Sequence, residues 1–214
     1  MEKAILQTLC YHDLFSYPLT LEEIHRFLIG RRATLKEVRL ALKKMIGRKV
    51  ENLGKFYFLK NRREIVAFRK KRKKYARKKQ RIARRLTKFL KLLPTVKMVA
   101  LTGTVAVDNA EEDDDIDLLI VTNAQRLWIT RIGAVLLIEL LASRPLLEKN
   151  RLRDAICLNI LLDENHLRMP SQKQNLYVAH EIAQMEILWQ KDDVYQKFLE
   201  ENQWVEKFLP NWRG

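Results

Sequence analysis

Hydrophobic residues at helical spacing predict three short helices at the start of the chain. Apolar side chains recur every three or four residues over 3–15, and the Tyr17-Pro18 pair ends that run. Two later segments each place a threonine three residues before a glutamate, the pattern of a capping box, at Thr20 and at Thr34. We therefore expect the second and third helices to begin at these threonines.

The segment after the third helix predicts a β-hairpin. Its sequence, VENLGKFYFLK, has two short apolar runs that meet at a turn near 52–54. Three helices followed by a hairpin resemble a winged helix, a variant of the helix-turn-helix reader of DNA. Lys36, Arg39 and Lys43 share one side of the third helix, as contact with nucleic acid requires. The same fold also serves in protein-protein modules, and that alternative stays open.

One long helix is expected next, over residues 61–93. The segment contains no proline or glycine, and its apolar residues recur at spacings of three, four and seven. We expect the following side chains to form the stripe that packs on the body of the protein: Ile65, Phe68, Tyr75, Ile82, Leu86, Phe89 and Leu93.

The positive charge of the chain is concentrated in this same segment. Residues 60–91 hold 17 Lys or Arg and one acid, a surplus of 16, whereas the other 24 bases and 25 acids give a net of −1. A basic face of this density attracts polyanions, which favours a nucleic-acid partner over a solvated face or a membrane surface. The run that we expect to bind nucleic acid is Lys70, Lys71, Arg72, Lys73 and Lys74.

The centre of the chain carries the clearest chemical pattern. A short apolar strand over 96–101 is followed by Gly103 and Thr104, and a second strand opens with Asp115-Ile116-Asp117. Because side chains alternate along a strand, the two aspartates project from one face. Two adjacent carboxylates repel each other unless a cation lies between them, and a hard divalent cation with oxygen ligands suits this pair.

This block resembles the DNA polymerase β-like nucleotidyltransferase superfamily over roughly residues 90–165. The family signature is a Gly-Ser pair, a spacer of similar length and an Asp-x-Asp strand with apolar flanks; Thr104 replaces the serine here and keeps the hydroxyl. The resemblance implies that Gly103 and Thr104 receive nucleotide phosphates, and that Asp115 and Asp117 hold Mg²⁺. It implies transfer of a nucleoside monophosphate from an NTP substrate.

A third carboxylate normally joins the pair from a neighbouring strand, which we expect at 155–163. Strict alternation along that strand puts Asn159 at the corresponding position, where it offers a carbonyl oxygen but no charge. Asp154 and Asp163 flank the strand as possible substitutes. Two functions therefore stay open: a nucleotidyltransferase whose acceptor is a nucleic acid, a protein or a small molecule, and a catalytically impaired, antitoxin-like or DNA-binding regulator.

The expected protein is α+β. A winged-helix-like domain (1–60), a basic connecting helix (61–93) and a small mixed sheet with C-terminal helices (94–214) follow one another, and the tail from 174 to 212 is expected to be helical. Cys10 and Cys157 lie among apolar neighbours and predict buried thiols of a reducing compartment. With no signal peptide and no membrane-spanning run expected, we place the protein in the cytoplasm. The sequence does not specify the oligomeric state.

Overall fold

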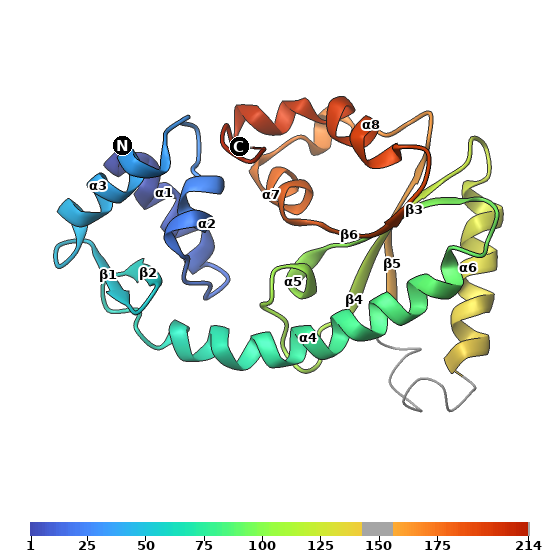
Figure 1. Cartoon of the computed structure of the whole chain (residues 1–214), viewed down its shortest axis with the longest axis horizontal. Helices are drawn as coiled ribbons and strands as arrows, with labels where there is room; N and C mark the ends of the chain where they lie inside the picture. Colours follow the sequence, from blue (N-terminus) through green and yellow to red (C-terminus); the bar gives the residue numbers. More distant parts are fainter. Residues whose placement is uncertain (143–155, 214) are drawn as a thin grey trace. The chain divides into compact units, whose positions relative to one another are not determined.

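The computed structural model describes residues 1–142 and 156–213, which form a mixed α+β protein, as predicted (Figure 1). The chain divides into two compact units. The first, called here the helical unit, contains Met1–Arg72, Gln172–Ala183 and Trp204–Gly214. The second, the sheet unit, contains Lys73–Ser171 and Gln184–Gln203. Since the boundary falls inside the helix α4, one continuous helix contributes side chains to both units.

The helical unit begins with the predicted three helices and hairpin. Its elements are α1 (Glu2–Asp13), α2 (Leu21–Arg26), α3 (Leu35–Met45), β1 (Val50–Leu53) and β2 (Phe56–Leu59), and the two strands pair antiparallel. Both capping boxes are present. Thr20 Oγ1 accepts from the Glu23 N–H at 3.3 Å and Glu23 Oε2 accepts from the Thr20 N–H at 2.8 Å, with the equivalent pair at Thr34 and Glu37. These local signals define the first turns of α2 and α3.

Two C-terminal segments belong to this unit. Helix α7 (Leu176–Gln184) contacts α1 through the stacked rings of Tyr11 and His180, whose centroids are 4.1 Å apart. The 3-10 turn Gln203–Lys207 leads to Phe208, whose carbonyl accepts from the Gly30 N–H at 2.7 Å. Residues from both ends of the chain therefore share one core.

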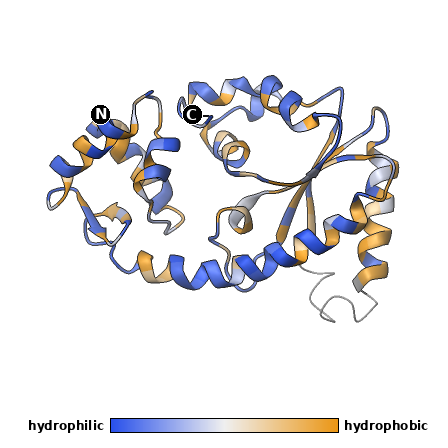
Figure 2. Cartoon of the chain, in the orientation of Figure 1, coloured by the Kyte–Doolittle hydropathy of each residue, from blue (hydrophilic) through white to orange (hydrophobic). Residues whose placement is uncertain are grey.

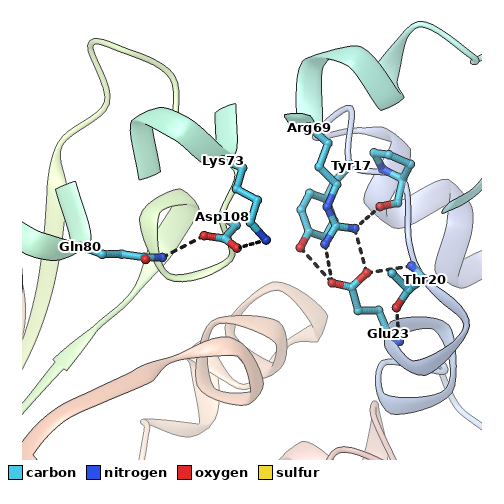
Figure 3. Close-up of polar contacts among 8 residues, drawn as sticks. Tyr17, Thr20, Glu23, Arg69, Lys73, Gln80 and Asp108 are labelled. Carbon is cyan, nitrogen blue, oxygen red and sulfur yellow. Dashed lines mark hydrogen bonds and ion pairs between the residues drawn. The ribbon is translucent and has the colours of Figure 1, made fainter. Parts of the chain in front are cut away.

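Arg69 ties the first turns of α4 (Ile65–Leu90) to α2. Its guanidinium donates to both carboxylate oxygens of Glu23, at 2.6 and 2.8 Å, and lies 4.1 Å over the ring of Tyr17 (Figure 3). Burial alone raises the pKa of Glu23, but the hydrogen bonds and charge of Arg69 outweigh it and the pKa is lowered. The buried charges are thus paired, which is the condition for their stability.

The sheet unit is built on a four-stranded mixed sheet in the order β5-β4-β3-β6. Its strands are β3 (Val96–Leu101), β4 (Ile116–Thr122), β5 (Ile156–Asp163) and β6 (Glu186–Gln190). Strand β5 runs parallel to β4, and the other pairs are antiparallel. The expectation of an all-helical tail was wrong, because Glu186–Gln190 is an edge strand on β3. A segment with three consecutive apolar residues does not distinguish strand from helix by its spacing, and pairing with the free edge of β3 decides the outcome.

Helices α4 and α6 (Leu127–Ala142) cover one face of this sheet, and α8 (Val194–Glu201) packs against β3 and β6. The remaining short turns are α5 (Gly103–Ala106) and a 3-10 turn at Ser171–Lys173. The α4 side chains that are fully buried in this core are Ala76, Ala83, Leu86 and Leu90. The predicted stripe is corrected at Phe68, which is 45% exposed, because in the helical unit Ile65, Val66 and Arg69 form the buried side of α4.

The rest of α4 is polar, as Figure 2 shows along most of its length. The prediction of buried thiols is also corrected, since Cys10 is exposed and Cys157 is half-buried. Within residues 1–142 and 156–213, none of the helices has both the length and the apolar character needed to cross a bilayer.

Two histidines of the helical unit are buried as neutral rings. His12 and His180 each place Nδ1 at 2.9 Å from the carbonyl four residues earlier, so Nδ1 carries the proton. Within the described residues neither Nε2 atom has a partner. Burial, and next the neighbouring His180, lower the pKa of His12 to about 3, and burial lowers the pKa of His180 to about 4.

Acid is therefore expected to destabilise the helical unit well above the pH at which its carboxylates titrate. Both folded-state pKa values lie below the unfolded value of 6.5, so the unfolded chain binds more protons as the pH falls below 6.5. The free energy of unfolding should fall by about 1.4 kcal/mol per pH unit for each ring between pH 6.5 and about 4. Urea titrations at pH 7.5, 6.5, 5.5 and 4.5 measure it.

His180→Phe should remove about half of this pH dependence, because one of the two buried neutral rings is lost. An unfolding free energy that stays flat from pH 6.5 to 4.5 in the wild type contradicts the prediction.

Candidate active site

Gly103 and Asp117 are packed tightly against each other where β3 ends and β4 begins, an arrangement called here the interlock. The Thr102 N–H donates to the Asp117 carbonyl at 2.9 Å, which brings the turn after β3 beside the start of β4. Gly103 has a φ of +67°, and a Cβ built there would lie 2.8 Å from Asp117 Oδ2. The Asp117 carboxylate thus occupies the space that any larger residue at 103 would need.

Asp115 directly precedes β4 and Asp117 is its second residue, and the charge of Asp115 acts on the Asp117 carboxyl. Asp115 is exposed and Asp117 is half-buried. Burial raises the pKa of Asp117, and the negative charges of Asp115 and Asp114 raise it further. A hydrogen bond from the Cys157 thiol acts in the opposite direction, but the pKa stays above its ordinary value. The ionised pair is therefore costly unless positive charge is added.

Cys157, not Asn159, is the β5 residue that pairs with Asp117. The register aligns Asp117 with Cys157 and Leu119 with Ile160, so β5 has one extra residue between these pairs. This bulge interrupts the strict alternation expected along the strand, and Asn159 is exposed at it. Burial and the neighbouring Asp117 raise the pKa of the Cys157 thiol, which stays protonated and donates to the carboxylate.

Neither suggested substitute supplies a third carboxylate among the described residues. Asp163 is aligned with Thr122, at the opposite end of β4 from Asp117, and accepts the backbone N–H groups of Gln125 and Asn165. Asp154 lies outside the described residues. In that described part of the chain, no three His, Cys, Asp or Glu side chains are arranged to hold a metal ion.

The acidic loop after α5 folds back on the Gly-Thr turn. Thr104 Oγ1 donates to Asp114 Oδ2 at 2.7 Å, and the Glu111 N–H donates to the same oxygen at 2.9 Å. Lys79 of α4 donates to the backbone carbonyls of Glu111, at 2.8 Å, and Asp114. The hydroxyl of Thr104 is thus oriented through a loop that α4 holds.

Helix α4 also holds the end of α5. The Gln80 amide donates to the Val105 carbonyl at 2.9 Å. It also donates to Asp108 at 3.2 Å, and Lys73 forms an ion pair with Asp108 at 3.0 Å (Figure 3). Asp108 has a φ of +60°, so these two contacts stabilise an uncommon backbone conformation. Three side chains of α4, those of Lys73, Lys79 and Gln80, therefore hold the segments around the site.

The residues expected to bind nucleic acid fall into two groups. Lys36, Arg39 and Lys43 are exposed on α3, on the side away from its buried residues, and Lys70, Lys71 and Lys74 are exposed on α4. Arg72 donates to the Phe15 carbonyl at 3.0 Å, and Lys73 is paired with Asp108.

Cys157, Asp114, Lys79 and Gln80 were missed as site residues. Gln80 did carry a signal, because it is the one uncharged polar side chain in the run from Arg77 to Arg85 and shares a helical stripe with Ala76 and Ala83. Cys157 carried none, since a bulge is not visible in the alternation of apolar residues.

Replacing Gly103 by alanine is expected to cost more stability than the same change at Gly30. Both glycines have a φ of +67°, but nothing lies within 4 Å of a Cβ at Gly30. Gly30→Ala should cost about 1 to 2 kcal/mol for the left-handed backbone alone. Gly103→Ala should cost clearly more, because the new methyl also displaces the Asp117 carboxylate. Urea denaturation compares the two variants, and equal losses contradict the interlock.

Comparison with known proteins found a weak structural likeness and no family. No known protein family matches the chain, and no curated protein shows significant similarity to it. A solved structure described as "Crystal structure of the toxin-antitoxin with AMP-PNP" resembles it weakly, with 17% sequence identity and a TM-score of 0.35. The match covers 57% of this chain and 89% of that one. At this TM-score the likeness carries no argument about function.

Proposed function

We propose that the sheet unit is a Mg²⁺-dependent nucleotidyltransferase that moves a nucleoside monophosphate from an NTP to an acceptor hydroxyl. The observation that carries the proposal is the interlock of Gly103 with Asp117, with Asp115 beside it. This arrangement places two carboxylates beside the Gly103 turn, whose backbone would receive the nucleotide phosphates.

The donor set fits magnesium that arrives with a nucleotide. Mg²⁺ is usually bound by one or two carboxylates together with substrate phosphates and water, rather than by a cage of protein ligands. Asp115 and Asp117 would be those carboxylates. The pKa of Asp117 is raised first by burial and then by the negative charges of Asp115 and Asp114, and a cation relieves that repulsion. When bound, Mg²⁺ neutralises charge on the triphosphate.

The other site residues position the substrate. The Gly103 turn would receive the phosphates, and the Thr104 hydroxyl, oriented by Asp114, lies at the same turn. The acceptor oxygen bonds to the α-phosphorus, the bond from that phosphorus to the bridging oxygen breaks, pyrophosphate leaves, and the hydroxyl proton passes to solvent. Alignment and charge neutralisation are the main protein contributions in such phosphoryl transfers.

One observation favours a second function, in which the site binds a nucleotide without turnover. The β5 residue beside Asp117 is a protonated thiol, which neither carries negative charge nor acts as a base at neutral pH. A regulator that responds to a bound NTP would keep the same carboxylate pair.

Asp117→Asn is expected to reduce transfer from α-³²P-labelled NTPs by at least about 100-fold. Loss of a residue that only supports a metal ligand already costs up to about 100-fold, and Asp117 is proposed to bind the metal directly. The wild type should label an acceptor in a panel of RNA, DNA, protein and small hydroxyl compounds when Mg²⁺ is present. Asp113→Asn is the matched control, since it removes the same charge from an exposed position in the adjacent loop.

Calorimetry with NTP and Mg²⁺ separates the two functions. The nucleotide-binding regulator is supported if the wild type binds an NTP but labels no acceptor, and if Cys157→Asp gains the ability to transfer the labelled nucleotide. A wild type that binds none of the four NTPs with Mg²⁺ refutes both.

A further inference from the structure

Eight of the nine basic residues of α4 in the sheet unit form an inward and an outward set, and the ninth, Lys78, is exposed but has an interaction within the protein. Inward residues are engaged with the body of the unit: Lys73 pairs with Asp108, Lys79 donates to loop carbonyls, and Arg84 pairs with Glu186 at 2.5 Å. These contacts account for their charge without any external partner.

The outward set forms a single row. It follows spacings of three, four, four and three residues, so its members lie on one side of the helix. All are exposed, and none pairs with an acidic side chain in residues 1–142 or 156–213. The outward row consists of Lys74, Arg77, Arg81, Arg85 and Lys88. At 1.5 Å per residue it extends for about 21 Å.

The helix itself does not compensate this row. Ile65–Leu90 contains no Asp or Glu, so each member has a like charge one turn away and no opposite charge on the same helix. Like charges at these spacings destabilise an isolated helix. A bound polyanion is the partner that removes this repulsion.

Nucleic acid fits the row better than a lipid surface. A helix that binds in a membrane interface inserts an apolar face, but the apolar face of α4 is buried, with Ala83, Leu86 and Leu90 at 0% exposure. Along the chain, the exposed large apolar side chains on either side of the row are Phe68 and Leu92, both outside it. One duplex strand offers a phosphate every 3.4 Å, about six along the row, and the three arginines suit phosphate oxygens.

We propose that Lys74, Arg77, Arg81, Arg85 and Lys88 bind the phosphate backbone of a nucleic acid without reading its sequence. This surface is assigned independently of the nucleotide site. It also differs from the run 70–74, because it omits Arg72 and Lys73, which are engaged within the protein.

The test changes all five residues to glutamine in the full chain. Fluorescence anisotropy with labelled 30-base-pair DNA and 30-nucleotide RNA should show affinity at least roughly tenfold lower than wild type, because most of the phosphate contacts are lost. The slope of log K against log salt should fall by about 0.9 per lost contact on duplex and about 0.7 on single strands. The relative losses on the two probes show which form is preferred.

The matched control removes five exposed lysines scattered over the chain: Lys49, Lys60, Lys173, Lys197 and Lys207 to glutamine. It has the same net charge as the five-residue variant of the outward row. An equal loss of affinity in this control therefore contradicts the proposal that the row is the binding surface. Arg81→Gln/Arg85→Gln, checked by circular dichroism, gives a partial loss in a minimally changed helix. Asp117→Asn should bind both probes like wild type, which separates this surface from the nucleotide site.

Binding of phosphatidylserine vesicles in preference to both nucleic acids assigns the row to membranes and overturns the proposal. A wild type that fails to bind either probe at 50 mM salt overturns it as well.

Discussion

The contact between the Gly103 backbone and the Asp117 carboxylate is the constraint on which the candidate site depends. It requires a left-handed glycine after β3, a backbone hydrogen bond from Thr102 to Asp117, and a β4 strand that begins one residue earlier, at Ile116. With those in place, Asp115 lies directly before β4 and Thr104 directly after Gly103. Burial and the neighbouring carboxylates raise the pKa of Asp117, so its ionised form is costly there. A bound cation would stabilise that ionised form.

Helix α4 links this site to the charge of the protein. Small residues let it approach the sheet, and at the edge of that contact Lys73, Lys79 and Gln80 hold α5 and the acidic loop. The same helix turns its outward row to solvent. A segment that composition describes only as basic therefore has two physical roles, which are separated by direction around the helix axis.

Much of the fold could be predicted because its signals are local. The capping boxes at Thr20 and Thr34, the hairpin, the long helix and the Asp-x-Asp strand each depend on residues within a few positions of one another. The strand at Glu186–Gln190 could not be predicted, because pairing with β3 across about 90 residues decides it. Phe68 was misplaced for a related reason: helical spacing gives the period of a stripe but not which of two adjacent stripes is buried.

The sequence by itself determined the α+β class, the strand that carries Asp117 and the concentration of charge in one helix. Each of these is set by residue type and short-range periodicity. Only the tertiary structure decided that Cys157 rather than Asn159 lies beside Asp117, because a one-residue bulge changes the register between two strands. It also decided which lysines and arginines are engaged within the protein, since that depends on acidic and carbonyl partners distant in the chain.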